Sequence, residues 1–213
     1  MKVGILALQG AFREHAEAFD AIGADAVLVR TPEQLAGVDA LAIPGGESTT
    51  IDKLLDSSGL REPVATLVRD GMPALATCAG LIVLAREVTG DALAGTGGSR
   101  SGTPDLVTEA SGAASAASAT RRLALLDVTV RRNGYGRQVD SFEAALAVKG
   151  LPGGPFEGVF IRAPVIETVG AEVETLAEHD GKPVLVRQGA IWAATFHPEL
   201  SGDLRIHQRF VES

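Results

Sequence analysis

The stretch PALATCAGLIVLA, residues 73–85, places the chain's only cysteine between two apolar runs. A short apolar run after a proline is typical of a buried strand, and AGLIVLARE after the cysteine predicts a helix. We therefore expect Cys78 where a strand turns into a helix. Such a turn holds a side chain above the sheet edge on a sharp bend, and the small residues Ala76, Ala79 and Gly80 permit that backbone.

The rest of the chain extends this α/β pattern. In the first half, KVGILAL, AFREHAEAFDAIG, DAVLVR and DALAIP alternate strand-like and helical patterns. This rhythm predicts βαβ units, hence a three-layer α/β fold with a mostly parallel central sheet flanked by helices. Strand patterns return at LALLDVTVRR, GVFIRA, VETLAEH, PVLVRQ and AIWAATF, and LRIHQRFV predicts a last helix. Residues 95–120, rich in Gly, Ser, Ala and Thr, predict a flexible surface loop within a single domain of residues 1–213.

Composition excludes several classes of protein. With 46% hydrophobic and 22% charged residues, the chain has an ordinary globular composition. Its net charge of -8 and the lack of a Lys/Arg run argue against nucleic acid as a partner. The start MKVGILALQG has too short an apolar run for a signal peptide, no stretch is long enough to span a membrane, and a lone cysteine forms no internal disulfide. We expect a cytoplasmic protein.

Cys78 itself has two interpretations. Free cysteine is among the most buried residue types, so it can simply fill the core. Alternatively it is a nucleophile, because a helix N-terminus offers free N–H groups and a positive potential that favour the thiolate and stabilise an oxyanion. Position alone leaves both open.

A nucleophilic cysteine needs a base and a group that orients the base. Of the four histidines, His15 and His207 lie in predicted helices and are expected to be surface or structural residues, and His179 falls in a turn. His197 in FHPEL follows a strand, with Glu199 two residues on. Residues two apart in an extended segment point the same way, so Glu199 is placed to orient the His197 ring. A solvated loop histidine is the alternative.

The stretch IPGGESTT, residues 43–50, ends a predicted strand with two glycines and opens a helix near Ser48. Glycine N–H groups can approach a ligand closely, although alone this is only an anion-binding turn or a helix cap. Together the three motifs supply a nucleophile, a base with its orienting group, and oxyanion donors.

At this point the sequence resembles the glutaminase subunits of pyridoxal 5′-phosphate synthase, within the triad-type glutamine amidotransferases. The resemblance covers nearly the whole chain and is carried by GILALQGAFREH, IPGGESTT, TCAGLI, RRNGYGRQVDSFE, FIRAP, AATFHPEL and RIHQRFV. The segments GRQVDSFE, FIRAP and LQGAFREH are the most specific. The fold implied is flavodoxin-like, as in class I glutamine amidotransferases.

The resemblance also implies residue roles. Cys78 would be the nucleophile, His197 the general base and acid, and Glu199 its orienting group. The N–H groups of Gly46 and Ala79 would form the oxyanion hole. Glutamine would be held by Gly46, Glu47, Ser48, Arg132, Ile161 and Arg162. Arginine forks suit a substrate carboxylate. No metal and no cofactor are expected.

The implied reaction is hydrolysis of L-glutamine to glutamate and ammonia, which passes through a tunnel to a separate synthase subunit in a hetero-oligomeric complex. Pyridoxal 5′-phosphate would be the product of that complex. The alternatives are the glutaminase of another amidotransferase, such as imidazole glycerol phosphate synthase, and a non-catalytic regulatory module. Ala76, where relatives often have glycine, and Gly134-Tyr135, where they often have Ser-Phe, depart from the family pattern.

Overall fold

The fold is built on a seven-stranded sheet in the order β10-β11-β12-β4-β3-β1-β2. The computed structural model describes residues 1–90, 122–132, 134 and 141–213, so the loop predicted at 95–120 lies outside the described residues. Five strands are parallel: β1 (Lys2–Leu6), β2 (Asp25–Val29), β3 (Ala40–Ile43), β4 (Ala74–Thr77) and β12 (Ile191–Ala194). The strands β10 (Glu174–His179) and β11 (Lys182–Gln188) extend the sheet in antiparallel fashion. The prediction of a mostly parallel, flavodoxin-like sheet is confirmed.

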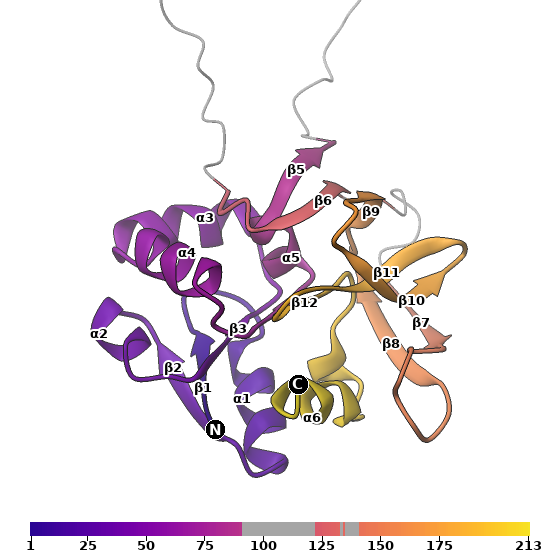
Figure 1. The fold of residues 1–213 in the computed structure, drawn as a ribbon, viewed down its shortest axis with the longest axis horizontal. Coiled ribbons are helices and arrows are strands. Elements are labelled where there is room, and N and C mark those ends of the chain that lie inside the picture. Colours follow the sequence, from indigo (N-terminus) through magenta and orange to yellow (C-terminus); the bar gives the residue numbers. More distant parts are fainter. Residues whose placement is uncertain (91–121, 133, 135–140) are drawn as a thin grey trace, which may run out of the picture.

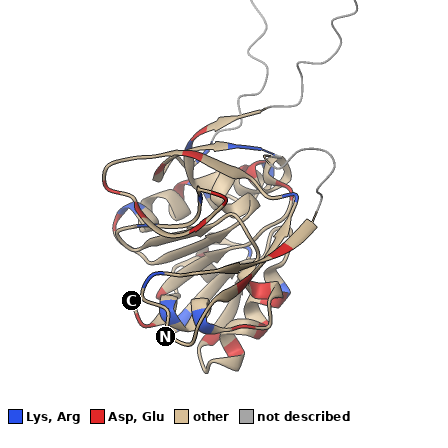
Figure 2. Ribbon diagram, turned by 90° about the vertical axis from the view of Figure 1, so that its right-hand side faces the viewer, with Lys and Arg blue, Asp and Glu red and all other residues tan. Residues whose placement is uncertain are grey.

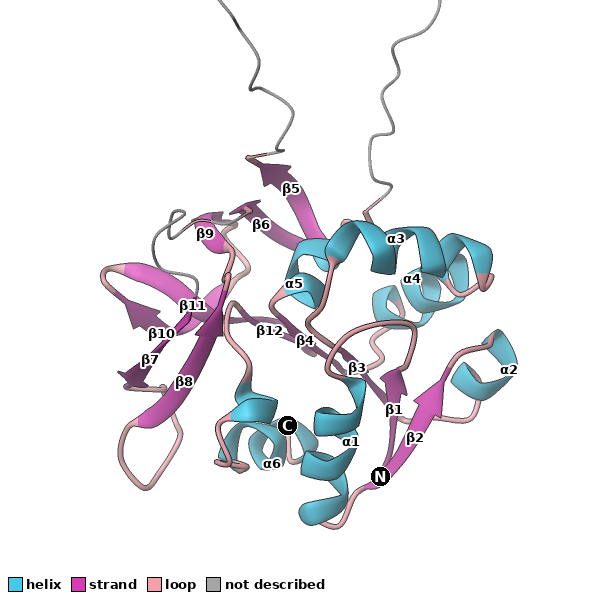
Figure 3. Cartoon of the chain, turned by 180° about the vertical axis from the view of Figure 1, so that it is seen from behind, coloured by secondary structure: helices cyan, strands magenta, loops and turns pink. Residues whose placement is uncertain are grey.

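Helices cover both faces of this sheet (Figures 1 and 3). One face packs against α1 (Phe12–Ala21), α6 (Arg205–Val211) and the hairpin of β7 (Ser141–Leu146) and β8 (Phe156–Ile161). The opposite face packs against α2 (Pro32–Leu35), α3 (Ser48–Ser57), α4 (Arg61–Arg69) and α5 (Ala79–Leu84). β1 contributes to both cores by alternation: the side chains of Val3 and Ile5 lie in one core and that of Leu6 lies in the other. In Figure 2 acidic and basic segments are interspersed over the outside of the molecule.

Three strands were not foreseen in the sequence. The helix predicted over AGLIVLARE ends at Leu84, and β5 (Ala85–Thr89) follows it directly. This segment pairs in parallel with β6 (Leu126–Arg131), which in turn pairs with β9 (Val165–Val169) in a small second sheet. β7 and β9 carried no prediction either. Pairing between distant segments, which local periodicity does not report, decides these elements.

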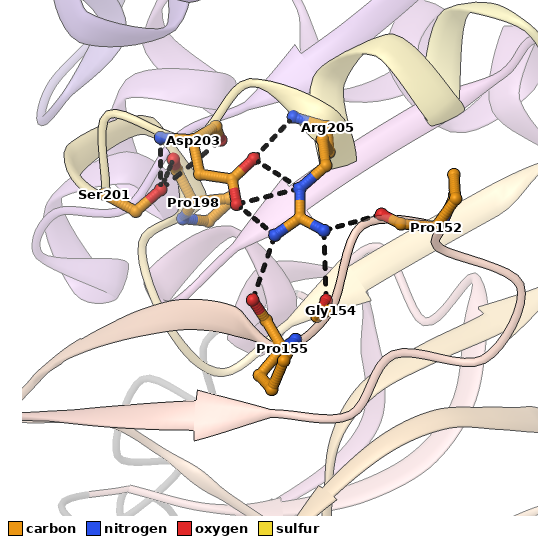
Figure 4. A network of polar contacts seen from close by, with 7 residues as sticks. All are labelled: Pro152, Gly154, Pro155, Pro198, Ser201, Asp203 and Arg205. Atoms are coloured by element: carbon orange, nitrogen blue, oxygen red, sulfur yellow. Dashed lines mark hydrogen bonds and ion pairs between the residues drawn. The ribbon is translucent and has the colours of Figure 1, made fainter.

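A polar network ties the start of α6 to the loop between β7 and β8 (Figure 4). The Arg205 guanidinium donates hydrogen bonds to the carbonyls of Pro152, Gly154 and Pro155 at 2.6, 3.0 and 3.0 Å. Asp203 holds the same guanidinium from the other side. The network therefore fixes α6 relative to the hairpin on the same face of the sheet.

The contact between α1 and α6 contains two buried histidines. His15 and His207 have no exposed surface, and the His15 Nδ1 lies 3.1 Å from the His207 Nε2. Phe19 packs against both imidazole rings, and Phe210 packs against Phe19. Burial lowers the pKa of His207 to about 3, with a further contribution from His15, and burial also lowers the pKa of His15. Of the two alternatives given from sequence, surface or structural, the surface one is wrong.

We expect acid to destabilise this fold. In the unfolded chain His207 takes up a proton near its ordinary pKa of 6.5, whereas in the fold it stays neutral down to about pH 3. Because the unfolded state binds more protons across that window, the free energy of unfolding decreases as the pH falls through it. From about pH 7.5 to about pH 5 this one site should cost ~2 kcal/mol. Urea unfolding measures the loss, and His207→Leu should flatten the pH dependence. An unchanged slope in that variant would contradict the assignment.

Candidate active site

The predicted site residues meet at one edge of the sheet. The loops after β1, β3, β4 and β12 follow the carboxyl ends of parallel strands, where ligands of doubly wound sheets bind. They surround a cavity of about 480 Å³. Nine of the ten candidates line it: Gly46, Glu47, Ser48, Cys78, Ala79, Arg132, Ile161, Arg162 and His197. The tenth, Glu199, contacts His197 but does not line the cavity.

Cys78 lies at the turn from β4 into α5, with φ 48° and ψ −105°. This left-handed conformation is uncommon for a residue with a side chain. The Cys78 N–H donates a hydrogen bond to the Ala194 carbonyl at 2.9 Å. Gly80 lets the turn pass close to β3, because a Cβ there would overlap the Ile43 carbonyl. The prediction of a strand-to-helix turn at Cys78 is confirmed.

His197 and Glu199 form a buried pair beside this thiol. The His197 Nδ1 lies 2.7 Å from the Glu199 Oε1, and the Glu199 side chain is fully buried. The prediction placed the two residues on an extended segment, but the segment is a 3₁₀ turn, η1 (Pro198–Leu200). The turn brings Glu199 back to the ring because Pro198 starts a tight helical bend directly after His197.

The charge on His197 follows from its neighbours. Burial alone would lower the pKa of His197, but hydrogen bonds and charge interactions with Cys78 and Glu199 outweigh burial and raise the pKa to about 10. Burial would raise the pKa of Glu199, but His15 and His197 hold it below its usual range. These neighbours therefore favour the imidazolium form of His197. A cation beside a cysteine favours the reactive thiolate.

The loop after β3, residues 44–47, is held from two sides. The Gly45 N–H donates to the Thr77 Oγ1 at 3.1 Å, and the Gly45 carbonyl accepts from the Ala11 N–H at 3.0 Å. A Cβ on Gly45 would overlap the His197 ring. Since N–H and C=O of a trans peptide point in opposite directions, this arrangement turns the Gly46 N–H away from Ala11.

The Glu47 side chain has a structural role. Its carboxylate caps α3, accepting from the N–H groups of Thr49 and Thr50 at 3.0 and 2.6 Å and from the Thr50 hydroxyl. The Glu47 carboxylate therefore binds the first turn of α3. The Glu47 N–H donates a hydrogen bond to the Gln9 Oε1 at 2.7 Å. Glu47 also lines the cavity.

The remaining three candidates, Arg132, Ile161 and Arg162, also line the cavity. Ile161 ends β8, and its carbonyl oxygen lies 3.9 Å from the Cys78 Sγ. Arg162 follows with φ 44°, and the Arg132 guanidinium lies 3.5 Å from the Thr49 hydroxyl. Both arginines line the cavity, and arginine side chains suit an anionic ligand.

The two departures from the family pattern fit the structure where it is described. The Ala76 methyl is fully buried in β4 between β3 and β12. A Cβ at Gly134 would overlap the Val165 side chain, so this position is matched to glycine. Tyr135 lies outside the described residues.

Sequence reasoning missed the loop after β1 as part of the site. Gln9, Gly10 and Ala11 line the cavity. A Cβ on Gly10 would overlap the Gly45 carbonyl, so the two loops touch through glycine backbone. The segment LQGAFREH had been singled out as specific, but its residues had been given no role.

In the described part of the chain no cluster of His, Cys, Asp or Glu has the makings of a metal site. None of the described helices is long and apolar enough to cross a membrane.

Comparison with known proteins agrees with the motifs. The model of the SNO glutamine amidotransferase family matches residues 5–96 and 106–213. A pyridoxal 5′-phosphate synthase subunit PdxT from Dehalococcoides mccartyi is 51% identical over 213 residues, covering 100% of this chain and 96% of the relative. A PdxT from Pelotomaculum thermopropionicum is 51% identical over 212 residues, covering 100% and 94%.

Solved structures agree as well. A glutamine amidotransferase crystal structure superposes with a TM-score of 0.81 at 44% identity, covering 99% of this chain and 97% of that chain. PurLQS from Thermotoga maritima, at 13% identity and a TM-score of 0.62, shares the fold alone. The motif resemblance is thus confirmed, and the chain belongs to the SNO glutamine amidotransferase family.

Proposed function

We propose that this chain hydrolyses L-glutamine through Cys78, His197 and Glu199 and delivers the ammonia to a pyridoxal 5′-phosphate synthase subunit. One observation carries the proposal: Cys78, in a left-handed turn at the cavity wall, lies beside the buried His197, whose ring is paired with the Glu199 carboxylate. The PdxT relatives favour this synthase over other amidotransferases.

Acylation begins with the Cys78 thiolate. The sulfur attacks the side-chain carboxamide carbon of glutamine, and the carbonyl electrons move onto the oxygen. The N–H groups of Gly46 and Ala79 hold this oxyanion. His197 then gives its proton to the nitrogen as the C–N bond breaks, which releases ammonia and leaves a γ-glutamyl thioester.

Deacylation uses the same histidine in its neutral form. His197 takes a proton from water, the hydroxide attacks the thioester, and the second oxyanion occupies the same N–H groups. Collapse releases glutamate and restores the thiolate with its imidazolium partner. Glu199 keeps the ring in one orientation through both steps.

We assign substrate recognition to the backbone of Gly46, Glu47 and Ser48. The other contacts are assigned to Arg132, Ile161 and Arg162. The guanidinium groups of Arg132 and Arg162 suit the α-carboxylate, and the Ile161 carbonyl is an acceptor near the sulfur. Because Glu47 caps α3, its carboxylate is left out of this assignment.

Replacing Cys78 is expected to abolish glutamine hydrolysis with the fold retained. Cys78→Ser and Cys78→Ala lose the thiolate, so ammonia release should fall by roughly 10⁴ or more. A glutamine-like electrophile should add once to the wild-type chain, and intact-mass measurement is sufficient because there is one cysteine. Appreciable hydrolysis by Cys78→Ala would refute the assignment and favour a non-catalytic module.

Substitutions of His197 and of Glu199 should reduce glutamine hydrolysis to different extents. His197→Asn is expected to be nearly as damaging as loss of Cys78, and Glu199→Gln less so because Glu199 only orients and supports the base. His179→Asn is the matched control, since His179 stacks on Phe142 and Phe160 away from the cavity lining. A Cys78→Ala/His197→Asn pair much worse than either single variant would contradict a cooperating triad.

The isolated chain should be a poor glutaminase that its synthase activates. We assign the switch to the Gly45–Gly46 peptide, whose rotation aims the Gly46 N–H toward or away from the oxyanion. One missing oxyanion donor costs on the order of 10²- to 10³-fold in rate. Ammonia release from glutamine, with and without saturating synthase, measures the effect, and equal rates would refute it.

A variant at the Gly45–Gly46 peptide needs a matched control variant. A Cβ on Gly46 would overlap the Gln9 Oε1, so Gly46→Ala alone also perturbs packing. Gln9→Ala/Gly46→Ala removes that clash and is compared with Gln9→Ala. If the double variant binds synthase and reaches the stimulated rate of Gln9→Ala, the switch lies elsewhere.

A further inference from the structure

Four polar side chains form a buried cluster next to His197: His15, Thr77, Glu199 and His207. All four side chains are fully buried, and none lines the cavity. The His15 Nε2 lies 3.1 Å from the Thr77 Oγ1 and 3.3 Å from the Glu199 Oε2. The mechanism above uses Glu199 alone, so the other three members need a physical account.

The proton positions in the cluster follow from its acceptors. A carboxylate oxygen only accepts, so the His15 Nε2 that faces it must carry the proton. The His15 Nδ1 is then an acceptor, and the His207 Nε2–H donates to it at 3.1 Å. The reverse assignment would aim a lone pair at the carboxylate and leave a buried N–H on His207 without a hydrogen bond.

The single Nε2–H of His15 serves two neighbours. Its hydrogen bond goes to Thr77, whereas the Glu199 Oε2 at 3.3 Å has no well-aligned hydrogen bond and receives the dipole as an electrostatic contact. Thr77 in turn accepts the Gly45 N–H at 3.1 Å. The His15 ring therefore contacts Glu199, which pairs with His197. Through Thr77 the same ring is linked to the Gly45–Gly46 loop.

We propose that His15 is a positioning residue, which holds the Glu199 carboxylate behind His197 and ties it through Thr77 to the Gly45–Gly46 loop. The inference rests on the proposed glutaminase function. His207 acts one step further out by keeping His15 in the Nε2–H form.

A neutral donor is what this position requires. Glu199 already pairs with the imidazolium of His197 at 2.7 Å. A Lys or Arg at position 15 would compete for the same carboxylate charge and weaken its hold on His197. A buried neutral imidazole stabilises the anion with a dipole and leaves its full charge to the base.

The first experiment reads the tautomers directly. Long-range ¹H–¹⁵N spectra of the isolated chain, with the four histidines assigned by substitution, should show His15 and His207 as neutral Nε2–H forms at pH 7. A charged His15, or His15 in the Nδ1–H form, would overturn the proposal. This measurement does not depend on an active complex.

The second experiment separates positioning from folding in the complex with synthase. His15→Leu should lower kcat by up to roughly 10-fold, because Thr77 loses a hydrogen bond and Glu199 loses the dipole of the ring, with KM changed less than about twofold. His15→Gln should recover most of kcat because its amide nitrogen can replace Nε2. In the isolated chain, iodoacetamide should alkylate Cys78 more slowly in His15→Leu than in His15→Gln. Equal kcat and alkylation rates in His15→Leu and wild type would overturn the proposal.

A double-mutant cycle completes the test. If His15 acts through Glu199, His15→Leu should cost less than about twofold in a Glu199→Gln background. The same loss in both backgrounds would indicate a merely structural role and overturn the inference. An inactive wild-type complex would instead refute the proposed function.

Discussion

The hydrogen bond from the Cys78 N–H to the Ala194 carbonyl is the interaction on which the site depends. It continues the β4–β12 ladder one residue beyond the end of β4, so the chain must turn with Cys78 at φ 48°. A residue held there costs about 1–3 kcal/mol. Parallel pairing of β4 with both neighbours, and the close approach of Gly80 to the Ile43 carbonyl, offset that cost.

The same pairing explains why motifs far apart in sequence meet. β3, β4 and β12 are adjacent and parallel, so the glycine loop, Cys78 and His197, which follow their ends, lie at one edge of the sheet. The antiparallel strands β10 and β11 extend the sheet only beyond β12. The proposed nucleophile, base and oxyanion donors are therefore consequences of strand order, and each needs only a short local motif.

Such local motifs can be predicted well from a sequence. The strand-to-helix turn at Cys78 and the helix start after the glycine loop were both predicted, because apolar runs and glycines mark them. Glu199 was placed beside His197 on the wrong backbone, an extended segment instead of a 3₁₀ turn. The strands β5, β7 and β9 were missed because pairing between distant segments decides them. His15 and His207 sit on helices that read as amphipathic, and only the packing of α1 against α6 shows that both are buried.

The proposed role of His15 would explain why this core contains two histidines. Two neutral imidazoles among Phe19, Ile206 and Phe210 are costlier than an apolar pair of similar size, since one His207 nitrogen has no hydrogen bond and acid protonates both rings on unfolding. Stability alone would favour leucines there. Leucine at position 15, however, would leave the Glu199 Oε2 facing hydrocarbon, and an anion in such surroundings takes up a proton or withdraws. A charged Glu199 next to His197 therefore requires a neutral donor on α1, which is His15. His15 in turn requires His207 on α6, because the His207 N–H fixes the tautomer of His15.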